Sequence, residues 1–204
     1  MKTPTGPEPA TRRADALANQ ARVLEAAREV FAEQGVSAEI KDIADRAGVG
    51  VATIYRGFGS KNELLRATIE RASQSIADLV TVAEQDDDPV AGLRLLVTGL
   101  LDYAESYGWL IQASIADPEI DRLRLSLPQQ DENRQRAAGV IERAMKSGAI
   151  SCEAPLEVLR LLLDGAVLAL AVRKRRKRPH PGAGEIADGL VGLLTASHRV
   201  AATP

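Results

Sequence analysis

The chain has 204 residues, of which 45% are hydrophobic and only 3% aromatic, and its formal net charge is −2. This hydrophobic content is enough for a packed core and excludes a globally disordered chain, while the shortage of aromatic residues beside abundant Ala and Leu favours helices over strands. Because the overall charge is slightly negative, any surface that binds nucleic acid must be a local face of the molecule.

The sequence also indicates in which cellular compartment the protein is expected. Cys152 is the single cysteine, so no intrachain disulfide can form, and we expect a reducing, cytoplasmic environment. The first residues lack the apolar core of a signal peptide. The most apolar stretch, 155–172, carries Glu157, Arg160 and Asp164. These charges argue against a membrane span, and we expect no membrane partner.

The N-terminal part predicts an arm followed by a helix. Residues 1–11 contain three prolines and no helical periodicity, so we expect residues 1–13 to form a flexible arm. Arg12 and Arg13 could reach a DNA minor groove from such an arm, or simply belong to a solvated tail. A first helix is predicted from about residue 15 to residue 34.

Two short helices and a tight turn are predicted next. Apolar residues with the spacing i, i+3, i+4 and i+7 begin at Ile40, and Ser37 is the expected N-cap of this helix. Gly48-Val49-Gly50 separates it from a helix that starts near Val51. A capping box, Ser60 to Glu63, then predicts the start of a fourth, longer helix.

Such a pair of helices is typical of a helix-turn-helix motif, whose second helix enters the major groove of DNA. The outward side chains offer hydroxyls and a guanidinium for phosphate or guanine, and small apolar groups for thymine methyls. Lysines near two helix N-termini could hold phosphates. The candidate DNA-binding residues are Lys41, Gly50, Val51, Ala52, Thr53, Tyr55, Arg56 and Lys61. The same two helices could also be an ordinary packing unit with no DNA nearby.

Residues 19–66 resemble the N-terminal DNA-binding domain of the TetR family of bacterial transcriptional regulators, through EAAREVFAEQG, DIADRAGV and TIYRGFGSKNELL. The resemblance implies that the third helix reads the major groove, and that Thr53, Tyr55 and Lys61 lie at positions that commonly contact DNA. Two departures stand out. Gly50 replaces the Ser that commonly caps the recognition helix, and the usual Thr-rich start of the second helix is absent, which leaves the phosphate contacts expected there open.

The rest of the chain is also predicted to be helical, over 90–106, 108–116, 118–125, 129–146, 155–173 and 184–199, with breaks at 86–89, at Gly108 and at proline-containing turns. No convincing strand pattern is present. We therefore predict an all-α fold with a DNA-binding domain over 14–66 and a helical effector-binding and dimerisation domain over 67–204.

The last two predicted helices are candidates for a dimer interface. The first of them is apolar on nearly all sides, so it must be buried on more than one face. The pair could complete the core of the monomer or form a four-helix interface with a second copy. The family resemblance favours a homodimer, and the expected interface residues are Leu162, Ala166, Leu170, Ile186, Leu190, Leu193 and Leu194.

An effector pocket is predicted at Tyr103, Tyr107, Trp109 and Gln112, where aromatic residues cluster with a polar side chain, although core packing explains them almost as well.

The basic run RKRRKR at 173–178 could touch nucleic acid, but cations that close a helix complement its dipole, and we favour that interpretation. His180 and His198 lack companions at ligand spacing, so we expect no metal. No catalytic signature or phosphate-binding loop is present, so we expect neither a cofactor nor an enzyme.

The sequence thus predicts a homodimeric transcriptional repressor that binds a double-stranded DNA operator and is released by a small-molecule effector. The effector would favour a conformation in which the two DNA-binding heads are wrongly spaced, with the fourth helix transmitting the change. The alternative is a helical ligand-binding or adaptor protein whose helix-turn-helix is only structural.

Overall fold

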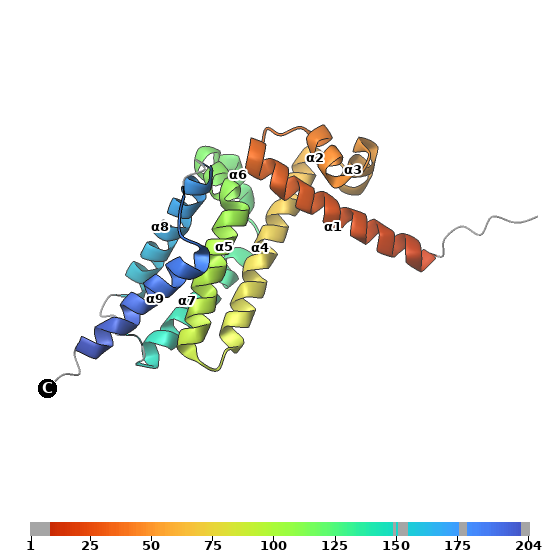
Figure 1. The fold of residues 1–204 in the computed structure, drawn as a ribbon. Helices are drawn as coiled ribbons and strands as arrows, with labels where there is room; N and C mark the ends of the chain where they lie inside the picture. Colours follow the sequence, from red (N-terminus) through yellow and green to blue (C-terminus); the bar gives the residue numbers. More distant parts are fainter. Residues whose placement is uncertain (1–8, 149, 151–154, 176–178, 201–204) are drawn as a thin grey trace, which may run out of the picture. The chain divides into compact units, whose positions relative to one another are not determined.

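The computed structural model describes residues 9–148, 150, 155–175 and 179–200, and every regular element among them is an α-helix (Figure 1). The predicted all-α fold is therefore confirmed. No helix in this described part of the chain combines the length and apolarity needed to cross a membrane. The helices are α1 (Pro9–Gln34), α2 (Ile40–Ala47), α3 (Val51–Phe58), α4 (Lys61–Gln85), α5 (Pro89–Ala116), α6 (Pro118–Leu125), α7 (Gln129–Lys146), α8 (Leu156–Arg175) and α9 (Ala183–Val200).

The chain divides into two compact units, Met1–Thr68 and Ile69–Pro204, and the boundary falls inside α4. In the first unit, α1 begins at Pro9, six residues before the predicted start at residue 15. Residues 9–13 are thus part of a helix and not of a flexible arm. Proline is well tolerated in the first turn, where its missing N–H would have had no partner in any case. Residues 1–8 and the side chains of Arg12 and Arg13 lie outside the described part.

The turn between α2 and α3 is fixed by backbone hydrogen bonds. Gly48 has φ 66° and ψ 36°, the left-handed conformation that glycine adopts without strain. Its N–H donates to the Asp45 carbonyl at 3.3 Å, and the N–H of Val49 donates to the Ala44 carbonyl at 3.0 Å. This pair of bonds is a Schellman motif, which satisfies the last carbonyls of α2 and reverses the chain within two residues.

The helix starts in this unit differ in how they are capped. The N-cap of α2 is Glu39 and that of α3 is Gly50, and neither uses a side-chain cap. Ser37 does not cap α2 as predicted, because its hydroxyl donates instead to the Gln34 carbonyl at 3.4 Å. Ser60 does cap α4, since its Oγ accepts the Glu63 N–H at 3.1 Å, which confirms that part of the predicted capping box.

The core of the first unit draws on all its helices. The side chains that are almost fully removed from water are Val23, Ala27, Val30 and Phe31 of α1, Ile43 and Ala44 of α2, Ile54 of α3 and Leu64 of α4. Small residues on α2 let it pack closely, and α1 contacts α2, which in turn contacts α3. The helix-turn-helix is therefore held against α1 through the packing of α2.

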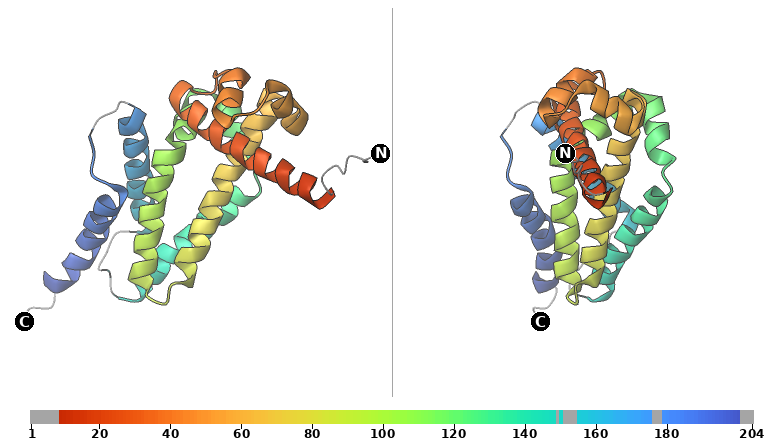
Figure 2. Two further views of the ribbon diagram at one scale, coloured as in Figure 1. Left: turned by 45° about the vertical axis from the view of Figure 1, so that its right-hand side comes forward. Right: turned by 90° about the vertical axis from the view of Figure 1, so that its right-hand side faces the viewer.

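In the second unit, α5 is the central helix and contacts α6, α7, α8 and α9. Both views in Figure 2 show α9 on one side of α5 and α4 on the other. One apolar core connects residues of all these helices except α6, from Val80 and Leu96 to Val140, Leu170 and Val191.

The structure corrects the predicted break at Gly108, because α5 runs unbroken from Pro89 to Ala116. Gly108 marks a close crossing of helices and not a turn: a Cβ at this position would lie 2.7 Å from the Cβ of Ala171 on α8. Beside it, the Gln112 side chain donates to the Ala171 carbonyl at 3.0 Å. The glycine is therefore required by packing between α5 and α8.

The last turn of α4 is tied to α7 by arginines. Arg143 donates to the carbonyls of Ala83 and Glu84, both at 2.9 Å, and so satisfies groups that a helix end leaves without partners. Arg136 forms a second link, with its Nη2 2.6 Å from Glu84 Oε2 and 2.9 Å from Thr81 Oγ1. These bonds fix α4 and α7 together within the second unit.

Candidate DNA-binding surface and ligand cavity

The short helix α3 is anchored on one side and open on the other. Ile54 is only 1% exposed, whereas Tyr55 next to it is 48% exposed. The face away from Ile54 carries most of the predicted DNA-binding residues: Gly50, Val51, Ala52, Tyr55 and Arg56 are exposed, and Thr53 is half-buried. A helix held by one buried anchor, with an open outer face, has the geometry of an element that enters a groove.

The guanidinium of Arg56 on this face forms only a weak hydrogen bond within the protein. Arg56 Nη2 donates to Thr53 Oγ1 at 3.4 Å, near the limit of a hydrogen bond. Since a guanidinium has five donors, nearly all of its capacity stays available to an outside acceptor. The helix contains no acidic residue, so its outer face carries only positive charge.

Two lysines flank α3 at helix starts. Lys41 is the second residue of α2 and is exposed, and Lys61 is the first residue of α4 and is half-buried. Neither forms an ion pair with any residue that the structure describes. A cation at a helix N-terminus meets the positive end of the helix dipole, which is unfavourable. An anion bound at the same place would interact favourably with both the lysine and the free backbone N–H groups.

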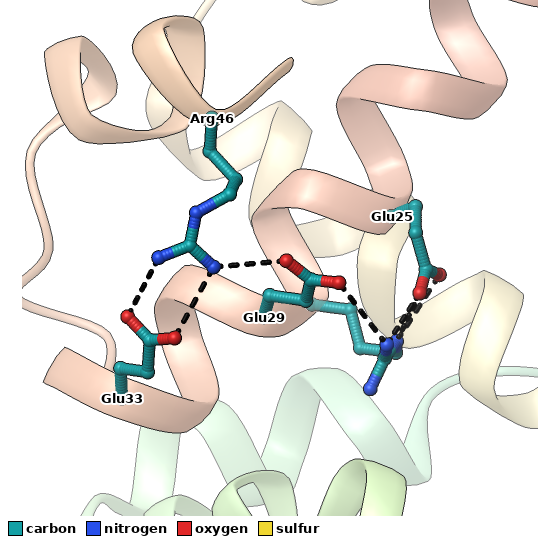
Figure 3. Close-up of polar contacts among 5 residues, drawn as sticks. Glu25, Glu29, Glu33 and Arg46 are labelled. Carbon is teal, nitrogen blue, oxygen red and sulfur yellow. Dashed lines mark hydrogen bonds and ion pairs between the residues drawn. The ribbon is translucent and has the colours of Figure 1, made fainter.

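Arg46 has a different role, which the sequence did not reveal. Its Nη1 lies 2.8 Å from Glu29 Oε2 and its Nη2 lies 2.8 Å from Glu33 Oε2, so it joins α2 to α1 (Figure 3). Arg28 extends the network to Glu25 and Glu29. The hydrogen bond from Arg46 holds the pKa of Glu33 below its usual value. The guanidinium is thus neutralised within the protein and positions α2, whereas Lys41, Arg56 and Lys61 remain available.

A cavity of about 390 Å³ lies entirely within the second unit. It is within the size range of pockets that hold small organic ligands. Its walls come from α4, α5, α6, α7 and α8, and the lining residues are Ile76, Leu96, Leu100, Tyr103, Leu110, Ile111, Ile115, Arg124, Gln130, Asn133, Arg134, Ala137, Ala138, Ile141, Arg160, Leu163, Asp164, Val167 and Leu168.

Of the four residues predicted to line an effector pocket, only Tyr103 does so. Tyr107 stacks on it with the ring centroids 5.0 Å apart, and Trp109 is buried. Gln112 bonds to the backbone of α8. None of these three residues lines the cavity. Tyr107 shares the face of α5 that carries Tyr103 and packs behind its ring, whereas Trp109 and Gln112 lie on other faces of the helix. The missed lining residues on α7 and α8 carry no local motif, and only the fold brings them together.

The Tyr103 hydroxyl forms no hydrogen bond with any described residue, although most of the ring is removed from water. Burial raises the pKa of Tyr103 well above its usual value, and the positive charge of Arg124 nearby opposes that rise. The phenol is therefore neutral across the physiological range and can both donate and accept a hydrogen bond.

The predicted dimer residues fall into three groups. Leu162 and Leu193 are 64% and 71% exposed, so each has surface available to a second copy. Ala166, Ile186, Leu190 and Leu194 are half-buried against the core of the second unit. Leu170 is only 3% exposed and packs inside its own protomer, which leaves it no surface for a second copy.

The exposed leucines on α8 belong to a longer stripe. Val158, Leu161, Leu162 and Leu168 are all exposed, with Gly165 between them. Their spacing places them on one face of the helix. The sequence carried this pattern, but the nearly continuous apolar character of the region hid which face was free.

The structure adds little about the basic run at 173–178, the two histidines and the cysteine. Arg173 is exposed and bonds the Pro179 carbonyl at 3.4 Å, while 176–178 and the side chains of residues 174 and 175 lie outside the described part. His180 Nδ1 lies 2.9 Å from the Pro181 carbonyl. Cys152 and the His198 side chain are not described. Among the described residues, no group of three or more His, Cys, Asp or Glu side chains could hold a metal ion.

Comparison with known proteins gives a consistent result. Residues 23–68 match the family model described as "Bacterial regulatory proteins, tetR family". The chain is 30% identical over 107 residues to the helix-turn-helix transcriptional regulatory protein RaaS of Mycobacterium tuberculosis, covering 52% of this chain and 50% of that protein. The chain thus spans about half the length of this curated relative.

Solved structures share the fold over nearly their whole length. The TetR family regulator PfmR of Thermus thermophilus superposes with a TM-score of 0.64 at 24% identity, over 86% of this chain and 97% of PfmR. The regulator FadR of Bacillus subtilis, in complex with stearoyl-CoA, gives a TM-score of 0.64 at 18% identity, over 86% of this chain and 97% of FadR. At these identities the likeness establishes the shared fold.

Proposed function

Because this chain belongs to the TetR family of bacterial regulatory proteins, we propose that it is a sequence-specific DNA-binding transcriptional regulator whose helix α3 enters the major groove. The observation that carries the proposal is the open outer face of α3 beside the buried anchor Ile54. Val51 and Ala52 would contact base edges, and Arg56 would pair with guanine or phosphate. A regulator of chromosomal DNA would act in the cytoplasm.

The phosphate contacts in this proposal come from helix starts and hydroxyls. Lys41 and Lys61 would each hold a backbone phosphate together with the N–H groups of their helices. Tyr55 and Thr53 would donate hydroxyl hydrogen bonds to phosphates. The Arg46 network would hold α2 against α1 while these contacts form.

We propose that the regulator acts as a homodimer through the exposed stripe on α8 and Leu193 of α9. A row of solvent-exposed leucines on a monomer is unfavourable unless another surface covers it. A two-fold pairing of α8 and α9 with their copies would bury it in a four-helix interface. Two recognition helices would then read successive major grooves of a near-palindromic site.

We further propose that a small molecule in the cavity of the second unit releases the protein from its operator, so that the regulator is a repressor. The cavity is the feature of the second unit that supports an effector, and the related fold of FadR was solved with stearoyl-CoA. A catalytic step forms no part of the proposal, because the similar proteins are named as regulators.

Fluorescence anisotropy with DNA from upstream of the protein's own gene, against unrelated DNA of equal length, tests the proposal. Specific binding is expected to be at least ~10³-fold tighter than binding to the unrelated DNA at physiological salt. Equal affinity for both fragments would reject sequence-specific regulation. Absence of binding even at low salt would favour the alternative, a helical ligand-binding or adaptor protein.

A further inference from the structure

The cavity of the second unit is lined mainly by apolar side chains, and its lining also contains partly exposed cationic ones. Its inner wall includes Leu96, Leu110 and Ile141, which are buried. Arg134 on α7 and Arg160 on α8 also line it and remain partly accessible to solvent. A ligand that filled this space would bury an apolar body inside and present its polar end to two guanidinium groups.

The two guanidinium groups are poorly satisfied by the protein. Arg134 lies 3.9 Å from Asp131, whose side chain is 89% exposed, and Arg160 lies 3.5 Å from Glu157, whose side chain is 79% exposed. Exposed ion pairs of this length contribute little and exchange readily with water or another anion. Most of the ten N–H donors of the two groups are therefore available to a ligand.

The third arginine of the cavity is held more firmly. Arg124 donates to Ser114 Oγ at 3.2 Å and to Asp121 Oδ1 at 2.8 Å, so it is fixed near Tyr103. The cavity lining thus contains three arginines and one acidic residue, Asp164. The outer carboxylates lie one helical turn away from their arginines and do not line the cavity.

We propose that the cavity binds an amphipathic anion, an apolar chain or ring system that ends in a carboxylate or a phosphate-bearing group, and that Arg134 and Arg160 hold the anionic end. The inference rests on the proposed function, since it names the chemical class of the effector. Bonds from guanidinium to an anion are shorter and stronger than bonds to a neutral acceptor. A cationic ligand of the same shape is disfavoured by the three arginines.

Calorimetric titration with matched ten-carbon probes tests the charge preference. Decanoate is expected to bind the full-length protein at least ten-fold more tightly than 1-decanol, and decylamine more weakly than either. Decanoyl-CoA separates the two sources of the anion: tighter binding than decanoate assigns a coenzyme A thioester, and weaker binding assigns the free acid. Equal affinity for decanoate and decanol, preference for decylamine, or no binding of decanoate and decanoyl-CoA would overturn the proposal.

Variants locate the site. Arg134→Gln with Arg160→Gln is expected to lower decanoate affinity at least ten-fold and decanol affinity less than two-fold. Arg122→Gln is the matched control, because Arg122 forms a similar exposed pair with Glu119 at 3.7 Å but does not line the cavity. Ala138→Phe should block both probes by filling the cavity. Unchanged decanoate binding in the double variant and in Ala138→Phe would place the ligand elsewhere and refute the inference.

Ligand binding and DNA binding are measured separately, so the two proposals can fail independently. Specific DNA binding without arginine-dependent decanoate or decanoyl-CoA binding would reject the effector class alone. Arginine-dependent decanoate binding by a protein that ignores its upstream DNA would reject the regulator and retain the anion site.

Discussion

Gly108 of α5 lies directly against Ala171 of α8: a Cβ at Gly108 would be 2.7 Å from the Ala171 Cβ and 3.0 Å from its Cα. The contact is between helix backbones, so no flexible side chain can move aside. Gly108→Ala would gain up to ~1 kcal/mol of helix propensity but would add a methyl group to a filled contact, which typically costs ~1–3 kcal/mol. We expect Gly108→Ala to lower the free energy of unfolding, measured by urea denaturation.

A second glycine provides a matched control that separates the packing effect from helix propensity. Gly139 is also inside a helix, but a Cβ there would meet nothing within 4 Å. Gly139→Ala should therefore raise the free energy of unfolding by ~0.5–1 kcal/mol. Adding Ala171→Gly to the Gly108→Ala variant should recover part of the lost stability. Stabilisation by Gly108→Ala to the same extent as by Gly139→Ala would show that the helices do not cross so closely.

The Arg46–Glu33 bond predicts a pH dependence of stability. Arg46 lowers the pKa of Glu33 in the folded protein below the ordinary value of 4.5. The stabilisation is therefore fully present above pH 4.5 and is lost as the pH falls through the lowered pKa. We expect Glu33→Gln to melt at a lower temperature than the wild type at pH 7, and the difference to shrink as the pH falls below about 4.

Glu119→Gln serves as the control for this experiment, because Glu119 forms only a 3.7 Å, highly exposed pair with Arg122. Its melting temperature should follow the wild type at every pH. A Glu33→Gln difference that stays constant between pH 7 and the acid range would exclude charge at Glu33 as its source.

The exposed apolar stripe on α8 predicts which substitutions will dissociate the dimer. Leu162→Asp or Leu193→Asp would place a charge in the proposed interface, where it would be buried without a partner. Each variant should be monomeric by light scattering and should retain its helical circular dichroism. Val82→Asp, at another exposed apolar position on α4, should leave the assembly unchanged. An intact dimer in both leucine variants would locate the interface on another surface.

Lys61 predicts a specific change in salt dependence. If it neutralises one phosphate, Lys61→Gln should weaken binding to all DNA sequences and reduce the slope of log K against log salt by about one unit. Arg122→Gln, which removes an exposed cation that is not among the proposed DNA contacts, should leave the slope unchanged. A wild-type slope in Lys61→Gln would remove Lys61 from the phosphate contacts.

Much of the structure of the first unit could be predicted from local sequence patterns. Apolar spacing and the turn glycines predicted α2 and α3 in place, and Ser60 predicted the start of α4. Each of these features depends on residues only a few positions apart in the chain, so it can be predicted from the sequence. Arg46 was missed because its partners Glu29 and Glu33 lie 13 to 17 residues away in the chain, on another helix.

In the second unit, the contacts between helices could not be predicted from the sequence. Gly108 looked like a helix break because a glycine that ends a helix and a glycine that admits a neighbouring helix are identical in sequence. Of the predicted pocket residues only Tyr103 lines the cavity, because an aromatic residue such as Tyr107 or Trp109 signals burial without indicating which neighbours cover it. Arg134 and Arg160 come together at one cavity only through the packing of α7 and α8.

The central claim is that α3 reads bases in the major groove, and methylation protection tests it most directly. Dimethyl sulfate attacks guanine N7 in the major groove and adenine N3 in the minor groove. With the protein bound to its upstream DNA, we predict protection of guanine N7 in two patches whose centres lie about one helical turn apart, ~10 base pairs, and unchanged reactivity of adenine N3 there. A specific complex in which every guanine N7 stays as reactive as in free DNA would contradict the account.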